Sequence, residues 1–135
     1  MTQTLPELHE ILYCSQLAAG QSPRVVGSIV SQARTRNAEH GITGLLVFDG
    51  QRFCQHLEGP RSLVVGLMSR ISEDPRHEQI RVVYDGPLVQ RRYQRFDMGF
   101  AQTEEPDDMA GIHALEGPAA LERFLALRPS FDVNG

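Results

Sequence analysis

Gln55 is an amide inside an apolar stretch of the chain. If residues 52–58 form a strand, side chains alternate across it, and Gln55 shares a face with Phe53 and Leu57. A buried amide without hydrogen-bond partners costs about 1–3 kcal/mol. Either this face is solvated, or backbone groups or a buried water bind the amide, or a bound molecule with donors and acceptors does.

Tyr13 raises the same question on another predicted strand, residues 9–15. Its ring lies on one face of that strand between Ile11 and Ser15. A buried phenol normally has a hydrogen-bond partner. Gln55 alone could be that partner, so a core Tyr13–Gln55 pair is an adequate structural interpretation.

Met98 and Asn37 also have simple structural interpretations when each is taken alone. A strand over residues 93–101 places Met98 on a face with Phe96 and Phe100, where methionine commonly fills gaps in a core. Asn37 follows the first predicted helix, where asparagine tolerates the left-handed backbone angles of a C-cap or turn. Neither residue by itself indicates a ligand.

Four charged or titratable residues gather near the end of the second predicted helix. They are Arg70, Asp74, Arg76 and His77. Arg70 and Asp74 have the i,i+4 spacing of a helical ion pair, so the simplest expectation is that they pair on a solvated face.

The chain has two cysteines, Cys14 and Cys54, each inside an apolar run. Because neither belongs to a C-x-x-C pair, the sequence predicts no metal site. Both are expected to be reduced and buried. A redox role for the pair stays open if the two strands that carry them are neighbours.

The composition of the 135-residue chain fits one globular domain. Apolar residues make up 41% and charged residues 22%, and the net charge of −4 with no block of like charges argues against general nucleic-acid binding. No run is long enough to span a bilayer, and the first residues lack the pattern of a signal peptide. We therefore expect a cytoplasmic protein without a membrane partner.

Periodicity and turn residues predict an α+β fold. The Asp49-Gly50 dipeptide between two apolar runs is a strong hairpin signal, and Ser22-Pro23 and Gly59-Pro60 are helix starts. The predicted order is β-α-β-β-α-β-β, with strands over 9–15, 42–48, 52–58, 79–84 and 93–101, and helices over 22–36 and about 60–74. This is a ferredoxin-like sandwich with a C-terminal helical extension, residues 1–101 being the core and 102–135 the tail.

Five segments, in order and at compatible spacing, resemble the BLUF family (sensors of blue light using FAD). They are LYCS at 12–15, Asn37 followed by GITGLL at 41–46, FCQHLEG at 53–59, Arg70-Ile71 with DPRH at 74–77, and Arg91-Arg92-Tyr93 through Met98. The resemblance covers residues 9–101. It implies a flavin held without covalent attachment between the two helices: FAD, with FMN or riboflavin as alternatives.

The resemblance assigns six side chains to flavin binding: Ile29, Asn37, Gln55, Arg70, Asp74 and His77. Asn37 is expected to bond the carbonyl side of the ring and Ile29 to pack on its face. The three charged or titratable residues are expected toward the ribityl and phosphate side or the ring edge. A flat apolar ring with one polar edge suits an apolar site that has a few placed hydrogen bonds.

The resemblance also implies a mechanism. Tyr13 donates an electron and a proton to the excited flavin, and Gln55 rearranges by rotation or tautomerisation, which shifts the absorption to the red. Met98 relays the change to the last strand. Phe96 stands where many members have tryptophan, and Arg36 stands where many have asparagine or histidine, so Arg36 is left out of the predicted site.

The implied function is that of a photoreceptor and not of an enzyme. The tail is too short for a cyclase or phosphodiesterase domain, so the signal is expected to pass to an unidentified partner protein or through a homo-oligomer. The apolar residues Leu121, Phe124 and Leu125 are expected to pack the tail on the sheet face away from the flavin, as the output surface. The alternatives are a flavin-free interaction module and, more remotely, an acylphosphatase-type hydrolase using Arg36 and Asn37.

Overall fold

The computed structural model describes the chain apart from residues 1–6, 94–97, 131 and 135. Its helices and strands follow the predicted order closely. The strands are β1 Leu8–Leu17, β2 Thr43–Phe48, β3 Arg52–Pro60, β4 His77–Leu88, β5 Gly99–Gln102 and β6 Asp132–Asn134. The helices are α1 Val25–His40, α2 Arg61–Ser72, α3 Pro106–His113 and α4 Pro118–Leu127, followed by a 3₁₀ turn at Arg128–Ser130.

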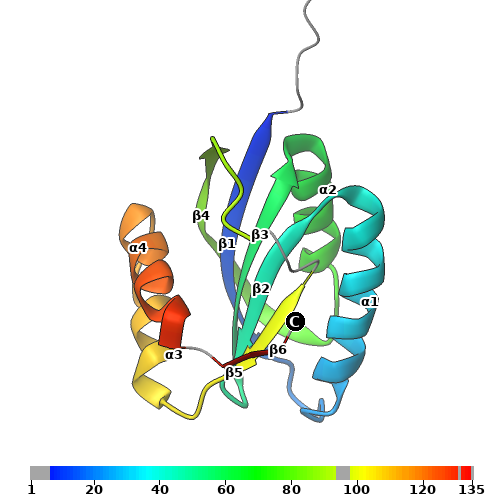
Figure 1. The fold of residues 1–135 in the computed structure, drawn as a ribbon. Helices are drawn as coiled ribbons and strands as arrows, with labels where there is room; N and C mark the ends of the chain where they lie inside the picture. Colours follow the sequence, from blue (N-terminus) through cyan, green and yellow to red (C-terminus); the bar gives the residue numbers. More distant parts are fainter. Residues whose placement is uncertain (1–6, 94–97, 131, 135) are drawn as a thin grey trace, which may run out of the picture.

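The described strands form one sheet in the order β4-β1-β3-β2-β5-β6. β1 pairs antiparallel with β3 and β4, and β2 pairs antiparallel with β3 and parallel with β5. Helices α1 and α2 cover one face of the sheet, and α3 and α4 cover the other (Figure 1). The predicted ferredoxin-like α+β fold is confirmed.

Two apolar clusters lie on the two faces of this sheet. Ile11, Phe53 and Leu57 belong to the cluster under α1 and α2, whereas Leu12 and Cys54 belong to the cluster under α3 and α4. Neighbouring residues of β1 and β3 enter different clusters because side chains alternate across a strand. Both faces of the two central strands are therefore buried.

The first helix begins and ends later than its sequence pattern predicted. Ser22 makes a turn ahead of the helix, where its hydroxyl accepts a hydrogen bond from the Arg24 backbone N–H at 3.2 Å. Asn37 is not the C-cap; it lies within the last turn of α1, fully buried. Gly41 is the C-cap, with φ of 66°, because glycine adopts left-handed angles without the steric cost that a Cβ brings.

The later strands also differ from the prediction. β4 extends from His77 to Leu88, longer than the predicted 79–84, because it pairs with β1 along its whole length. β5 covers only Gly99–Gln102 of the predicted 93–101, and residues 94–97, including Phe96, lie outside the described residues. β6 was not predicted, because a three-residue strand is defined by its pairing with β5 and not by a pattern of its own.

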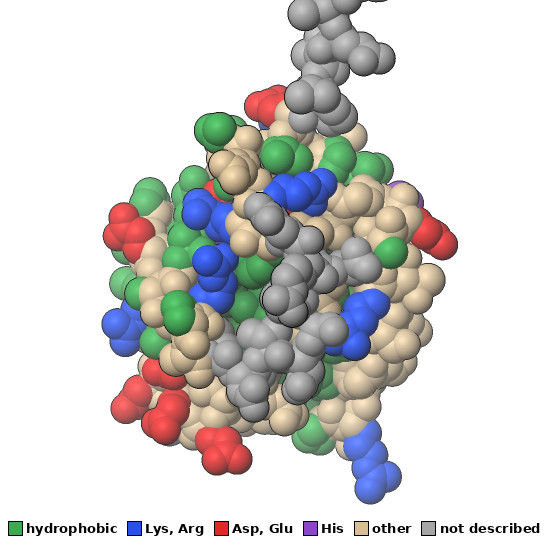
Figure 2. All heavy atoms as spheres, viewed as in Figure 1, with side chains coloured by type: hydrophobic (Ala, Val, Ile, Leu, Met, Phe, Trp, Pro, Cys, Tyr) green, Lys and Arg blue, Asp and Glu red, His purple; other side chains and the backbone are tan. Residues whose placement is uncertain are grey.

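The helices of the tail pack on the face of the sheet opposite α1 and α2, as predicted, and the tail also adds β6 to the sheet (Figure 1). Met109, Ile112 and Phe124 are completely buried in the cluster against β1, β2 and β3. Figure 2 shows acidic side chains gathered where α3 begins, at the lower left, and Asp107 and Asp108 lie in its first turn. Carboxylates there interact favourably with the helix dipole. None of the described helices is both long and apolar enough to cross a bilayer.

Gly44 allows β2 to lie close to β3. A Cβ at this position would meet the backbone oxygen of His56 at 2.1 Å, which no rearrangement of side chains could relieve. Glycine is therefore needed at this position in the centre of the sheet, because a larger residue would force the two strands apart.

Replacing Gly44 with alanine should lower the free energy of unfolding by at least about 2 kcal/mol, because backbone atoms must move apart. Gly66→Ala is the matched control: this helical glycine has nothing within 4 Å of its missing Cβ. That change should stabilise the protein by about 0.5–1 kcal/mol. Urea unfolding followed by circular dichroism measures both, and equal effects would contradict the packing explanation.

Candidate functional site

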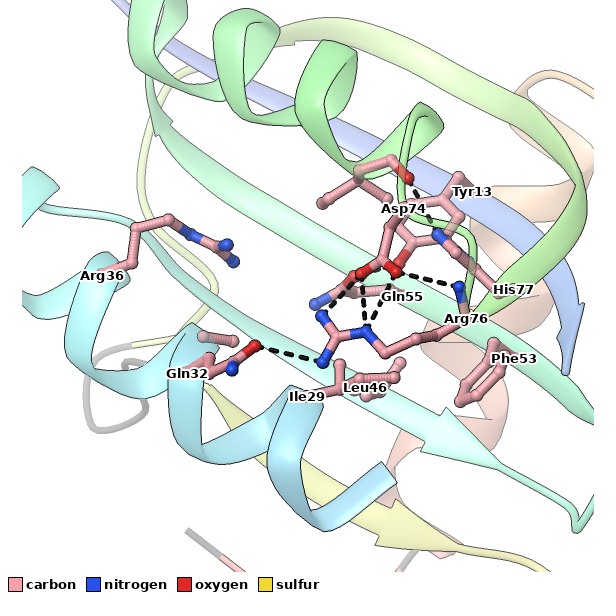
Figure 3. Close-up of a pocket in the computed structure, with 12 residues that line it drawn as sticks. Tyr13, Ile29, Gln32, Arg36, Leu46, Phe53, Gln55, Asp74, Arg76 and His77 are labelled. Atoms are coloured by element: carbon pink, nitrogen blue, oxygen red, sulfur yellow. Dashed lines mark hydrogen bonds and ion pairs between the residues drawn. The ribbon is translucent and has the colours of Figure 1, made fainter. Parts of the chain in front are cut away.

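A hollow of about 480 Å³, counting the space open to solvent, lies between α1, the end of α2 and the sheet (Figure 3). Apolar side chains form much of its wall: Ile29, Leu46, Phe53 and Ile71. Polar groups from α1, β1, β3 and the α2–β4 connection complete it. The mixture of apolar walls with a few polar groups is typical of a small-molecule site.

Tyr13, Gln55 and Met98 form a buried hydrogen-bonded chain at this site. The Tyr13 hydroxyl donates to Gln55 Oε1, and Gln55 Nε2 donates to Met98 Sδ at 3.2 Å. Tyr13 and Gln55 are each 4% exposed, and the antiparallel pairing of β1 and β3 places them directly opposite one another. The structure thus brings together the three residues predicted to carry the photochemistry.

The electrostatics of Tyr13 favour its neutral form. Burial raises the pKa of the phenol far above its usual range, and the nearby thiols and Asp74 add to the effect. The hydroxyl therefore keeps its proton and remains a donor to Gln55.

The predicted Arg70–Asp74 ion pair is wrong. Asp74 pairs with Arg76 instead, with 2.6 Å between Oδ2 and Nη2, and this interaction holds the pKa of Asp74 below its usual value. The i,i+4 geometry does not apply because α2 ends at Ser72, so Asp74 has already left the helix. Arg70 is exposed on α2 and is not among the residues that line the hollow.

Arg76 spans the hollow between the α2–β4 connection and α1. Besides its bonds to Asp74, its Nη1 donates to Gln32 Oε1 at 3.1 Å (Figure 3). Arg76 and Gln32 were not in the predicted site.

His77 lines the hollow, but the protein binds both of its ring nitrogens. Nδ1 lies 2.9 Å from Ser15 Oγ, and Nε2 lies 2.9 Å from the backbone oxygen of Ile71. The ring also packs edge-on against Tyr13 and Phe53. In this structure His77 orients the wall of the site through these contacts.

Helix α1 supplies a row of residues to the hollow: Ile29, Gln32, Ala33 and Arg36. Asn37, predicted for the site, is buried in the same helix and is not among the lining residues. Arg36, which had been left out, does line the hollow, and its Nε is buried without a hydrogen-bond partner among the described residues. The spacing of 29, 32, 33 and 36 is that of one helix face, a signal that could have identified Arg36.

A second polar network is buried on the opposite face of β3. His56 Nε2 donates to Glu10 Oε1 at 2.8 Å, and His56 Nδ1 accepts from the Tyr93 hydroxyl at 2.7 Å. Hydrogen bonds from His56 and Arg92 lower the pKa of Glu10, although burial alone would raise it. Phe124 of α4 packs edge-on against His56, with 5.5 Å between the ring centroids. The network joins the central strands to the tail.

A family model described as sensors of blue-light using FAD matches residues 8–99. The chain belongs to the BLUF family. The BLUF protein BlrB in its dark state is 31% identical, with a TM-score of 0.77 over 90% of this chain and 94% of BlrB. BlrP1 of Klebsiella pneumoniae, solved with FMN and cyclic diGMP, is 32% identical, with a TM-score of 0.67 over 70% of this chain and 26% of BlrP1.

The photoactivated adenylate cyclase subunit beta of Euglena gracilis is 40% identical over 86 residues, or 64% of this chain. The match covers only 10% of the cyclase subunit, so this chain corresponds to a small part of that relative. The BLUF domain is a photosensory module, and FAD is the cofactor of the family.

The residues of the hollow fit a flavin. Ile29, Leu46 and Phe53 provide apolar surface for the ring, and Gln55 offers an amide that can donate or accept at a polar edge. The buried Nε of Arg36, which has no partner in the part of the chain that the structure describes, supplies a further donor. This combination matches a large apolar ring that carries carbonyl and nitrogen acceptors along one side.

The Tyr13–Gln55 hydrogen bond predicts strong energetic coupling. Tyr13→Phe and Gln55→Leu should each destabilise the protein by about 1–3 kcal/mol, because each leaves a buried polar partner unpaired. The double variant should cost clearly less than the sum. Urea unfolding of the flavin-free proteins measures this, since bound ligand would add its own stabilisation. Additive effects would show that the two groups do not depend on one another.

Proposed function

We propose that this chain is a blue-light photoreceptor in which Tyr13, Gln55 and Met98 respond to a flavin bound without covalent attachment in the hollow. FAD is the expected cofactor. The observation that carries the proposal is the buried hydrogen-bonded chain from the Tyr13 hydroxyl through the Gln55 amide to Met98 Sδ. A phenol and an amide so joined at the wall of the hollow can exchange protons and hydrogen bonds without water.

A bound flavin supplies a chromophore that absorbs blue light and, once excited, can take up an electron and a proton. Tyr13 is suited to release both, because its pKa is raised by burial and its proton stays on Oη until the electron leaves. The burial of Tyr13 and Gln55 excludes competing solvent. The proton on Oη is held in the hydrogen bond to Gln55 Oε1.

Gln55 can occupy two arrangements that differ in hydrogen-bond character. In the present one, Oε1 accepts from Tyr13 and Nε2 donates to Met98. A half-turn of the amide exchanges the two ends, which are nearly equal in shape, so that Nε2 faces Tyr13 and Oε1 faces the thioether. In that second arrangement Oε1 and Met98 Sδ are both acceptors and face each other, which favours the present arrangement in the dark. Tautomerisation of the amide is the other way to place a donor at the oxygen.

Flavin binding is proposed for Ile29, Asn37, Gln55, Arg70, Asp74 and His77, together with Arg36 and Arg76. Ile29, Gln55, Asp74 and His77 line the hollow, which supports their part of the assignment. Arg70 is exposed on α2 and Asn37 is buried in α1, so their assignment rests on the sequence resemblance.

The output is proposed to pass through the tail to a partner protein or to a second copy of the chain. Gln55 and His56 are adjacent in β3 and lie on opposite faces, and His56 contacts Phe124 of α4. A change in the amide therefore has a short route through the sheet to α4.

The Gln55→Leu variant tests the photochemical role. Wild-type protein should show a flavin spectrum that shifts reversibly to the red under blue light, and the variant should bind flavin but lose the shift. Gln51→Leu, at an exposed glutamine in the hairpin turn, is the matched control and should shift like wild type. A colourless protein that cannot be reconstituted with flavin would instead favour the flavin-free interaction module.

The Arg36→Gln variant tests the binding role of the Arg36 guanidinium, whose Nε has no hydrogen-bond partner among the described residues. Its affinity for flavin should fall by about tenfold, corresponding to about 1.4 kcal/mol, as expected for loss of one charge-assisted hydrogen bond. Fluorescence titration with riboflavin, FMN and FAD measures the loss, and a loss restricted to FMN and FAD would locate Arg36 at the phosphates. Arg24→Gln, exposed ahead of α1, is the control. Equal affinities in both variants would refute the assignment.

A further inference from the structure

Cys14 and Cys54 form a cross-strand pair of free thiols. They lie directly opposite one another in the antiparallel pairing of β1 and β3, with 3.9 Å between their Sγ atoms. Directly opposed residues in such a pair have Cα atoms about 4.5–5.5 Å apart, within the range that a disulfide spans. Each Sγ needs to move by only about 1 Å to reach the bonding distance of about 2.05 Å.

The thiol pair is the next register step after the Tyr13–Gln55 pair. Tyr13 and Gln55 face the hollow, and Cys14 and Cys54 lie behind them on the face covered by α3 and α4. The same segments of β1 and β3 therefore hold both the two thiols and the Tyr13–Gln55 pair (the photoactive pair).

Charged and polar groups from two other elements surround Cys14. His113, at the end of α3, donates from Nε2 to the backbone oxygen of Phe53 at 3.0 Å, and Arg81 of β4 is paired with Cys14 in the sheet. The hydrogen bond with Cys54, together with His113 and Arg81, lowers the pKa of Cys14 below its usual value, although burial opposes the shift. Burial raises the pKa of Cys54. This asymmetry makes Cys14 the nucleophile of the pair.

We propose that Cys14 and Cys54 are a reversible redox site that closes to an intrachain disulfide in exchange with a small disulfide such as oxidised glutathione. The Cys14 thiolate attacks one sulfur of the small disulfide and releases one thiol, forming a mixed disulfide. The Cys54 sulfur, on losing its proton, attacks Cys14 Sγ and releases the second thiol. The protein loses two electrons and two protons, and the small disulfide is reduced to two thiols.

The tail controls access to this site. Cys14 is 2% exposed and Cys54 is 0% exposed, beneath the cluster that contains Met109, Ile112 and Phe124. Exchange therefore requires transient lifting of α3 and α4, and it is slow compared with exchange at a surface thiol.

Closing the disulfide changes the photoactive pair. The disulfide fixes the spacing and twist of β1 and β3 one residue from Tyr13 and Gln55, and it therefore restricts the movement of the backbone that carries this pair. We expect the rate of dark recovery to change by about threefold between the dithiol and the disulfide. The expected change in dark recovery rests on the proposed photoreceptor function, whereas the formation of the disulfide does not.

Full-length, flavin-loaded protein is equilibrated without oxygen at a series of ratios of reduced to oxidised glutathione, quenched with acid, alkylated and weighed by mass spectrometry. Wild type should form a species lighter by two hydrogen atoms and protected from alkylation, whose fraction follows the glutathione ratio. Cys14→Ala and Cys54→Ala should not form it. Unquenched portions of the same equilibrations give the dark-recovery rate, which should follow the ratio in wild type and be constant in both variants.

Complete alkylation in denaturant at every ratio would overturn the redox site, and so would adducts with glutathione or disulfides between molecules only. A disulfide that leaves dark recovery unchanged would overturn the coupling to the photoactive pair. Fully reduced protein with no light-induced shift would count against the proposed photoreceptor function while the mass measurement still decides the disulfide. Circular dichroism of the two alanine variants confirms that they are folded.

Discussion

The antiparallel register between β1 and β3 is the constraint on which the site depends. It sets Tyr13 opposite Gln55 and Cys14 opposite Cys54, with the first pair in the hollow and the second under the tail. A slip of one residue would turn both side chains of the strand that moved to the opposite faces of the sheet. Apolar residues on both faces of the two strands oppose such a slip, because every one of them would lose its cluster.

β3 carries polar side chains into the protein on both faces. Gln55 is bound by Tyr13 and Met98 on one side, and His56 is bound by Glu10 and Tyr93 on the other. Buried polar groups are costly when any partner is missing, so each network favours the arrangement in which all of its members are hydrogen-bonded. Adjacent positions of one strand thereby connect the hollow under α1 and α2 with the helices of the tail.

Much of the fold was predictable from local pattern. The alternation in β1 and β3 and the Asp49-Gly50 hairpin depend on neighbouring residues, which the sequence displays directly. The assignments that failed depended on where an element ended. Arg70 and Asp74 have helical spacing, but α2 ends between them, and the partner of Asp74 became Arg76. Asn37 was assigned to a cap because the end of α1 was placed too early.

The sequence by itself determined the order of the first seven helices and strands and the faces of the central strands, because these follow from alternation and turn chemistry. The resemblance to the BLUF family, and not the cost of a buried amide alone, singled out Tyr13 and Gln55. Only the tertiary structure decided that Arg36, Gln32 and Arg76 line the hollow, that Met98 reaches Gln55, and that the thiols of Cys14 and Cys54 are 3.9 Å apart. These contacts join residues far apart in the chain. Their partners are set by sheet order and helix ends, which no local pattern encodes.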